Sequence, residues 1–201
     1  MTSIPALKEW AAICHALLAG EQIIDLRKGG LREERPSGDG RHFGVDSTHA
    51  WLYPTVEHQK AELLKPAYRH WIDLAPNAPV GHTIRVQGYV EIVEAITITE
   101  PAELAAITTR VIWSDEYAAS RMKWKHRDPL WVLILRAHRL ARPLDIVWND
   151  EYGGCKSWVN FIDAPTDLAT LESEPALSEA VFDARVNGVR EALQNATTTT
   201  A

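Results

Sequence analysis

Residues 83–99 (TIRVQGYVEIVEAITIT) alternate apolar and polar side chains over an unusual length. Alternation with a period of two predicts a β-strand with one buried face, and ordinary strands have about 5 or 6 residues. A strand of this length has to bend to stay on one core, and Gly88 offers a position for a bulge or a sharp bend. Any fold of this chain therefore has to accommodate one long, bent strand.

A second β-type segment, residues 130–140 (LWVLILRAHRL), is apolar on both faces in its first half and carries arginine and histidine in its second half. Shorter patterns predict strands at residues 22–28, 51–53, 145–148 and 157–162. Helical spacing and capping residues predict helices at residues 4–19, 55–64, 101–107, 114–122 and 178–194. This mixture predicts an α+β fold, either a bent antiparallel sheet or a small β-barrel, with flanking helices and a C-terminal helix. The layout of the long bent strand, two helices and an apolar return strand resembles that of PUA-like β-barrels.

The net charge of −6 is distributed unevenly along the 201 residues. Residues 1–162 contain 20 acidic and 19 basic side chains, whereas residues 163–201 contain seven acidic and two basic ones. We therefore predict an α+β domain over residues 1–162, followed over residues 163–201 by an acidic helical appendage that ends in a disordered tail. Within the first part, residues 121–142 carry seven Arg or Lys and one acid, and such a local field attracts phosphate whatever the net charge.

Several classes of protein are excluded by missing patterns. No apolar run approaches the roughly 18 residues of a membrane helix, and the N-terminus lacks the basic and apolar regions of a signal peptide. The two cysteines match no disulfide framework, so a reducing, cytoplasmic location is expected. Zinc-hydrolase, P-loop, nucleophile-elbow and dinucleotide patterns are missing, so no metal-ligating residues are predicted and the cofactor is left unknown.

Five short segments, in this order, carry a family resemblance; they are residues 6–10 (ALKEW), 26–30 (LRKGG), 54–59 (PTVEHQ), 128–133 (DPLWVL) and 151–158 (EYGGCKSW). We refer to them as the family segments. Together they resemble the bacterial domain-of-unknown-function family 1802, over roughly residues 5–162. The resemblance implies membership of that family and no particular activity.

Arg27 and Lys28 end a predicted strand just before the Gly29-Gly30 turn. Arginine gives bidentate contacts to phosphate or carboxylate, and glycine allows the backbone to approach a ligand closely. The alternative is a hairpin whose glycines supply a positive φ angle and whose cations face solvent.

Glu57 and His58 place a carboxylate and an imidazole side by side. In an enzyme, Glu57 or Asp128 would orient His58 as a general base. The alternative is a capping arrangement, with Glu57 against a helix N-terminus and Gln59 bonded locally.

Residues 123–128 (KWKHRD) interleave Trp124 with the cations Lys125 and Arg127, as single-stranded nucleic-acid grooves do. The alternative is a turn before the next strand, with Trp124 in the core.

Residues 151–158 (EYGGCKSW) combine two glycines with Lys156, Ser157 and Trp158, which favours an anion-binding loop. Cys155 beside a lysine has the setting of an activated nucleophile, although a buried structural thiol is the preferred interpretation.

Our leading hypothesis is a nucleic-acid-binding or phosphate-binding domain, in which lysine and arginine hold phosphate and Trp124 or Trp158 stacks on a base. The groove would be lined by Arg27, Lys28, Glu57, His58, Lys125, Arg127, Lys156 and Trp158. A second hypothesis is a hydrolase or nuclease that uses His58 with Glu57 or Asp128. A third is a protein-interaction module whose acidic C-terminal helix docks on the basic part of the domain.

Overall fold

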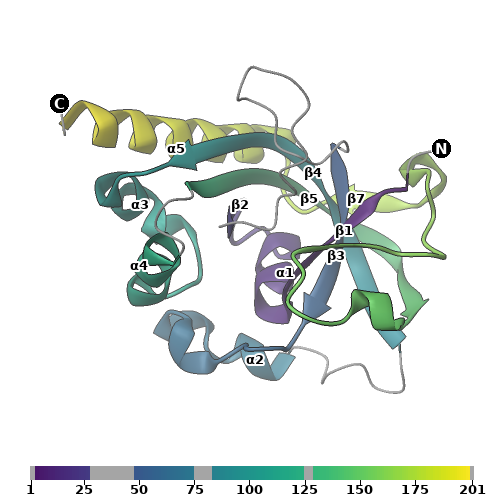
Figure 1. The fold of residues 1–201 in the computed structure, drawn as a ribbon. Coiled ribbons are helices and arrows are strands. Elements are labelled where there is room, and N and C mark those ends of the chain that lie inside the picture. Colours follow the sequence, from purple (N-terminus) through teal and green to yellow (C-terminus); the bar gives the residue numbers. More distant parts are fainter. Residues whose placement is uncertain (1–2, 28–47, 75–82, 125–128, 200–201) are drawn as a thin grey trace, which may run out of the picture.

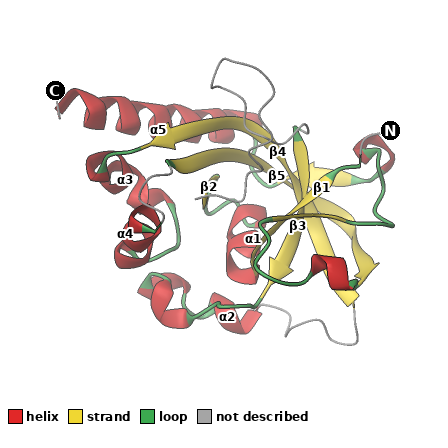
Figure 2. Cartoon of the chain, in the orientation of Figure 1, coloured by secondary structure: helices red, strands yellow, loops and turns green. Residues whose placement is uncertain are grey.

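The computed structural model describes residues 3–27, 48–74, 83–124 and 129–199, which form a bent, open sheet with helices around it (Figures 1 and 2). The strands are β1 (Pro5–Trp10), β2 (Ile24–Arg27), β3 (His49–Thr55), β4 (Thr83–Ile98), β5 (Leu130–Val147), β6 (Trp158–Asn160) and β7 (Ser173–Pro175). The α-helices are α1 (Ala11–Leu18), α2 (Trp71–Leu74), α3 (Pro101–Ile107), α4 (Asp115–Lys123) and α5 (Glu179–Thr199). The predicted α+β class, with a bent sheet, flanking helices and a C-terminal helix, is confirmed.

The strands of the sheet follow the order β2-β5-β4-β3-β1-β6, and β7 pairs with a later part of β5. All strand pairs are antiparallel except β1 with β3, which run in the same direction. The sheet is therefore antiparallel except at this one pair. The parallel pair places β1 inside the sheet, between β3 and β6.

The long strand predicted at residues 83–99 is β4, and it pairs with β5 along almost its whole length. The register shifts between Val86 and Gly88 and again between Ile92 and Glu94, so the predicted bend at Gly88 is confirmed. A Cβ atom at residue 88 would lie 2.2 Å from the His138 carbonyl oxygen. Glycine at this position lets the two long strands approach each other where they bend.

The N-terminal segment differs from its prediction, because Pro5–Trp10 is a strand and the helix begins only at Ala11. Every residue of β1 after Pro5 is buried, including Lys8 and Glu9. A strand that is buried on both faces shows no alternation, so its apolar residues fitted the helical spacing of α1 equally well.

The helix predicted at residues 55–64 is also wrong, because only Ala61–Leu63 form a single 3-10 turn there. His58 has a φ angle of 61°, in the left-handed region that a right-handed helix does not contain. Helices α3 and α4 are confirmed, and the Ser114 side chain accepts a hydrogen bond from the Tyr117 amide as the predicted cap of α4.

Helix α5 packs its apolar side against the main core, with Phe182, Val186 and Val189 buried. Its Arg190 pairs with Glu94 of β4 at 2.8 Å, and its Asp183 lies 3.6 Å from Arg136 of β5. The helix continues to Thr199, where a disordered tail was predicted. A domain boundary near residue 162 stays a prediction. No described helix has both the length and the apolar character that a bilayer crossing needs.

Candidate functional site

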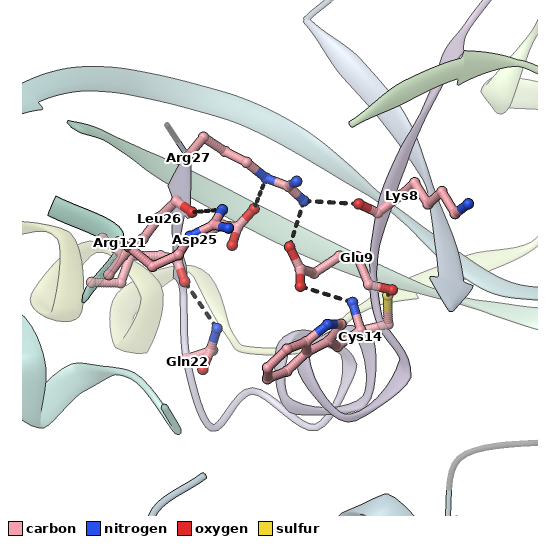
Figure 3. Close-up of polar contacts among 10 residues, drawn as sticks. Lys8, Glu9, Cys14, Gln22, Asp25, Leu26, Arg27 and Arg121 are labelled. Atoms are coloured by element: carbon pink, nitrogen blue, oxygen red, sulfur yellow. Dashed lines mark hydrogen bonds and ion pairs between the residues drawn. The ribbon is translucent and has the colours of Figure 1, made fainter. Parts of the chain in front are cut away.

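Strand β1, which contains the family segment 6–10, contacts three of the other four family segments. Successive side chains of a strand point to opposite faces, so the neighbours Lys8 and Glu9 face different surroundings. Figure 3 shows Glu9 turned toward Arg27 of β2, while the Lys8 amine points away from this group. Two groups of polar contacts therefore share one strand.

Arg27 lies between two carboxylates in the first group (Figure 3). Its Nη2 atom is 2.6 Å from Glu9 Oε2, and its Nε atom donates to Asp25 Oδ2 at 2.6 Å. Nη2 also donates to the Lys8 carbonyl oxygen at 3.1 Å. All three charged side chains are buried, and we call Glu9, Asp25 and Arg27 the buried charge cluster.

Burial acts on the ionisation of Glu9 and Arg27 in this cluster. Burial raises the pKa of Glu9, and the charge of Arg27 opposes that shift. Burial disfavours the Arg27 cation, but the attraction of Asp25 and Glu9 outweighs it and raises the pKa of Arg27. Burial also raises the pKa of the Cys14 thiol well above its ordinary value, with Glu9 adding to the shift. Cys14 is therefore a protonated core residue.

The cluster has one unsatisfied atom and one connection toward the surface. No described group donates a hydrogen bond to Asp25 Oδ1, although Asp25 is 0% exposed. From helix α4, Arg121 Nη2 donates to the Leu26 carbonyl oxygen at 3.4 Å, next to the cluster (Figure 3). The Arg121 guanidinium carbon also lies 6.0 Å from the ring centre of Trp124, which is 51% exposed. Arg121 thus lies between the buried cluster and the exposed indole.

The second group of contacts surrounds the Lys8 ammonium. Nζ donates to Glu57 Oε2 at 3.1 Å, to the Gly154 carbonyl at 3.0 Å and to the Tyr152 carbonyl at 3.3 Å. The ring centre of Tyr53 is 5.4 Å from the same nitrogen. The Lys8 side chain is only 4% exposed, so its three donors are used to join β1 to two other family segments.

Gln59 connects the same region to helix α1, because its Oε1 atom accepts a hydrogen bond from the Ala12 amide at 3.0 Å. The residue before the helix, Trp10, provides no side-chain cap, so Gln59 satisfies one of the free N-terminal amides from outside. The Gln59 backbone amide also donates locally to the Val56 carbonyl oxygen at 3.2 Å, so its side chain adds a contact with a distant part of the chain.

We expect Gln59→Ala to lower the free energy of unfolding by about 1 kcal/mol, as the loss of a helix cap does. Urea denaturation followed by circular dichroism measures this change. Gln194→Ala, on an exposed position of α5, is the matched control and should change stability by a few tenths of a kcal/mol at most. Equal stabilities of the two variants would contradict the capping role.

The structure places some predicted site residues in these contacts. Arg27 is committed to Asp25 and Glu9, so its guanidinium does not face solvent as a free phosphate ligand would. Glu57 is half exposed and pairs with Lys8, whereas no described residue forms a hydrogen bond or ion pair with the exposed His58. The predicted Glu57–His58 pair is not among the described contacts.

In the segment 151–158, Lys156 Nζ donates to the Glu151 carbonyl oxygen at 2.8 Å and Trp158 is partly buried. Cys155 is exposed, so the preferred prediction of a buried thiol is wrong. The remaining predicted residues, Lys28, Lys125, Arg127 and Asp128, lie outside the described residues.

Sequence reasoning missed Lys8, Glu9 and Asp25, which carry most of the contacts. Lys8 and Glu9 lay within the predicted first helix, where charged residues are expected on a solvated face. Asp25 interrupts the apolar run of residues 23–26, and a carboxylate two residues before an arginine on one strand face was the available signal.

Contacts link described parts of all five family segments into one connected group. Residues 6–10 contact Arg27, Glu57 and Gly154, and Arg27 pairs with Trp131 in the sheet. Groups of three or more potential metal-ligating His, Cys, Asp or Glu side chains do not occur within the described ranges.

The fold and these contacts define an α+β protein with a bent, open sheet and a charge cluster buried against its first strand. The model of the family described as "Domain of unknown function (DUF1802)" matches residues 6–188, which is most of the chain. The chain belongs to this family. The match includes all five family segments and extends beyond residue 162 into α5.

Among solved structures, the ASCH protein of Zymomonas mobilis is 12% identical, and the alignment covers 80% of this chain and 89% of that chain with a TM-score of 0.46. A serine-to-alanine variant of the same protein is 13% identical, with 71% and 73% of the two chains covered and a TM-score of 0.42. The similarity is limited at these TM-scores and carries no conclusion about function. No curated protein sequence matches the chain.

Proposed function

We propose that this protein binds nucleic acid, or another phosphate-bearing ligand, at the C-terminal end of α4. The surface is formed by Arg121, Lys123 and Trp124, and we call it the Trp124 surface. The observation that carries the proposal is the exposed Trp124 indole with the Arg121 guanidinium 6.0 Å from its ring centre.

An exposed indole flanked by cations has the chemistry that single-stranded nucleic acid requires. Bases stack on aromatic faces without sequence preference, and neighbouring cations contact the phosphates. Lys123 is exposed beside Trp124, and Arg121 is partly exposed. Lys28, Lys125 and Arg127 are additional candidate phosphate contacts, on the basis of the sequence alone.

The hydrolase or nuclease hypothesis has less support. The described carboxylate of Glu57 is held by Lys8, and general acid–base catalysis by His58 needs a partner at near-contact distance. The interaction-module hypothesis also has less support, because α5 is attached to the domain by buried apolar side chains rather than by charge alone.

We expect Trp124→Ala to weaken the binding of a short oligothymidine about 5- to 150-fold, because each base stacked on an aromatic side chain contributes about 1–3 kcal/mol. Fluorescence anisotropy of a labelled oligonucleotide measures the affinity, which should also fall as salt rises. Trp124→Phe is the matched control and should retain most of the affinity. Unchanged affinity in Trp124→Ala, or affinity that is insensitive to salt, would refute the proposed function.

A further inference from the structure

We propose that a ligand bound at the Trp124 surface draws Arg121 away from the buried charge cluster, and that the cluster takes up a proton in response. This inference rests on the proposed function and adds a pH dependence to the same site.

The argument begins with the number of charges in the cluster. Two carboxylates, Glu9 and Asp25, are buried with a single cation, Arg27. A buried charge without a partner is costly, so the cluster needs either a second cation or a proton. A second described cation that acts on Glu9 is Arg121, which donates to the Leu26 carbonyl between Asp25 and Arg27 in the chain.

Arg121 is attached to the cluster less firmly than Arg27. Its hydrogen bond to the Leu26 carbonyl is 3.4 Å long and its other hydrogen bond is with Tyr117 of the same helix, whereas Arg27 makes two ion pairs of 2.6 Å with the cluster carboxylates. Arg121 is also partly exposed and lies against the ring of Trp124. A phosphate near that ring would compete for the Arg121 guanidinium, because charge-assisted bonds to phosphate are stronger than one to a backbone carbonyl.

The groups that face Glu9 determine where the proton goes. They are Asp25 and Arg27 from β2, Tyr117 and Arg121 from α4, and Cys14 from α1. Burial raises the pKa of both Tyr117 and Cys14, so neither adds negative charge near neutral pH. Arg121 lowers the pKa of Glu9, which burial has already raised. Removing Arg121 therefore raises the pKa of Glu9 further.

The direction of the pH effect follows from linkage. When a ligand raises the pKa of an acid, the protonated form of the protein binds it more tightly. Affinity is then highest below the pKa of Glu9 in the free protein. It falls as the pH rises through the interval between the free and bound values, which lies above the ordinary value of 4.5. For one proton the decrease is at most about tenfold per pH unit.

The test is calorimetric titration of the full chain with an oligothymidine of about eight nucleotides, in two buffers that differ in ionisation enthalpy. Thymine has no group that titrates between about pH 5 and 8, so any proton exchanged with the buffer belongs to the protein. We expect net proton uptake on binding by the wild-type protein and none from this cluster in Glu9→Gln. The glutamine keeps an oxygen for the Trp10 amide, which the Glu9 carboxylate accepts at 2.8 Å.

A second variant distinguishes proton uptake by Glu9 from proton uptake by a histidine near Trp124 in the sequence. His126 lies close to Trp124 in the chain and outside the described residues, and histidine side chains titrate near neutral pH. His126→Gln should leave the proton uptake unchanged. Tight binding without uptake, or uptake that is lost in His126→Gln and kept in Glu9→Gln, overturns this inference and leaves the proposed function intact. A wild-type protein that does not bind the oligonucleotide at any pH refutes both.

Discussion

Arg27→Met is expected to lower the free energy of unfolding by about 3–5 kcal/mol, the cost of removing one partner from a buried ion pair. The guanidinium is the cation that Glu9 and Asp25 share, and all three side chains are buried. Methionine has a similar length but no charge, so both carboxylates would remain buried without compensation. Urea denaturation at neutral pH measures the change.

Two further variants test this explanation. Arg85→Met removes a cation from a surface pair with Asp145, where both side chains are more than half exposed, and should cost about 1 kcal/mol or less. Adding Glu9→Gln and Asp25→Asn to Arg27→Met removes the uncompensated charges and should restore part of the lost stability. If the triple variant is less stable than Arg27→Met alone, the loss comes from packing and not from charge.

Lys8→Met is expected to lower the free energy of unfolding by about 2–4 kcal/mol, because a buried hydrogen bond to a charged group contributes about 1.5–3 kcal/mol and the bonds to the exposed Glu57 and Gly154 add less. The variant leaves the carbonyl of the buried Tyr152 without its Lys8 donor, whereas the Gly154 carbonyl still accepts from the Lys156 amide. The change should also loosen the segment 151–158. Hydrogen exchange of its backbone amides measures that local effect beside the urea denaturation.

Lys156→Met is the matched control, since it applies the same substitution within the same segment. The Lys156 ammonium donates to the Glu151 carbonyl in an exposed setting, so its loss should cost less than about 1 kcal/mol. Comparable losses in the two variants would contradict the specific role of the buried Lys8 ammonium.

The parts of the fold that sequence reasoning predicted correctly are those with local signals. Strand β4 alternates along its length, and helix α4 has Ser114 as its cap followed by acidic residues in its first turn. Helix α3 begins with Pro101 at its first position and has a capping box. Each of these signals depends on residues within a few positions of one another.

The candidate site was predicted less well than the fold. The family segments were identified, and they do contact one another, but most of the residues that join them were absent from the candidate residues. Arg27 was expected to face a ligand, and its partners are Glu9 and Asp25. Whether a charged side chain is solvated or paired depends on what the rest of the chain brings to it, and a strand pattern does not contain that information.

The sequence by itself determined the α+β class, the long bent strand with its glycine, and the family to which the chain belongs. Only the tertiary structure decided that Pro5–Trp10 is a strand and that its Lys8 and Glu9 hold the family segments together. The physical reason is that periodicity reports which side chains need burial, whereas the partners of a buried charge come from segments far apart in the sequence. The structure also decided where some of the charge lies. Two of the acidic residues that contribute to the net charge of −6, Glu9 and Asp25, are buried against Arg27.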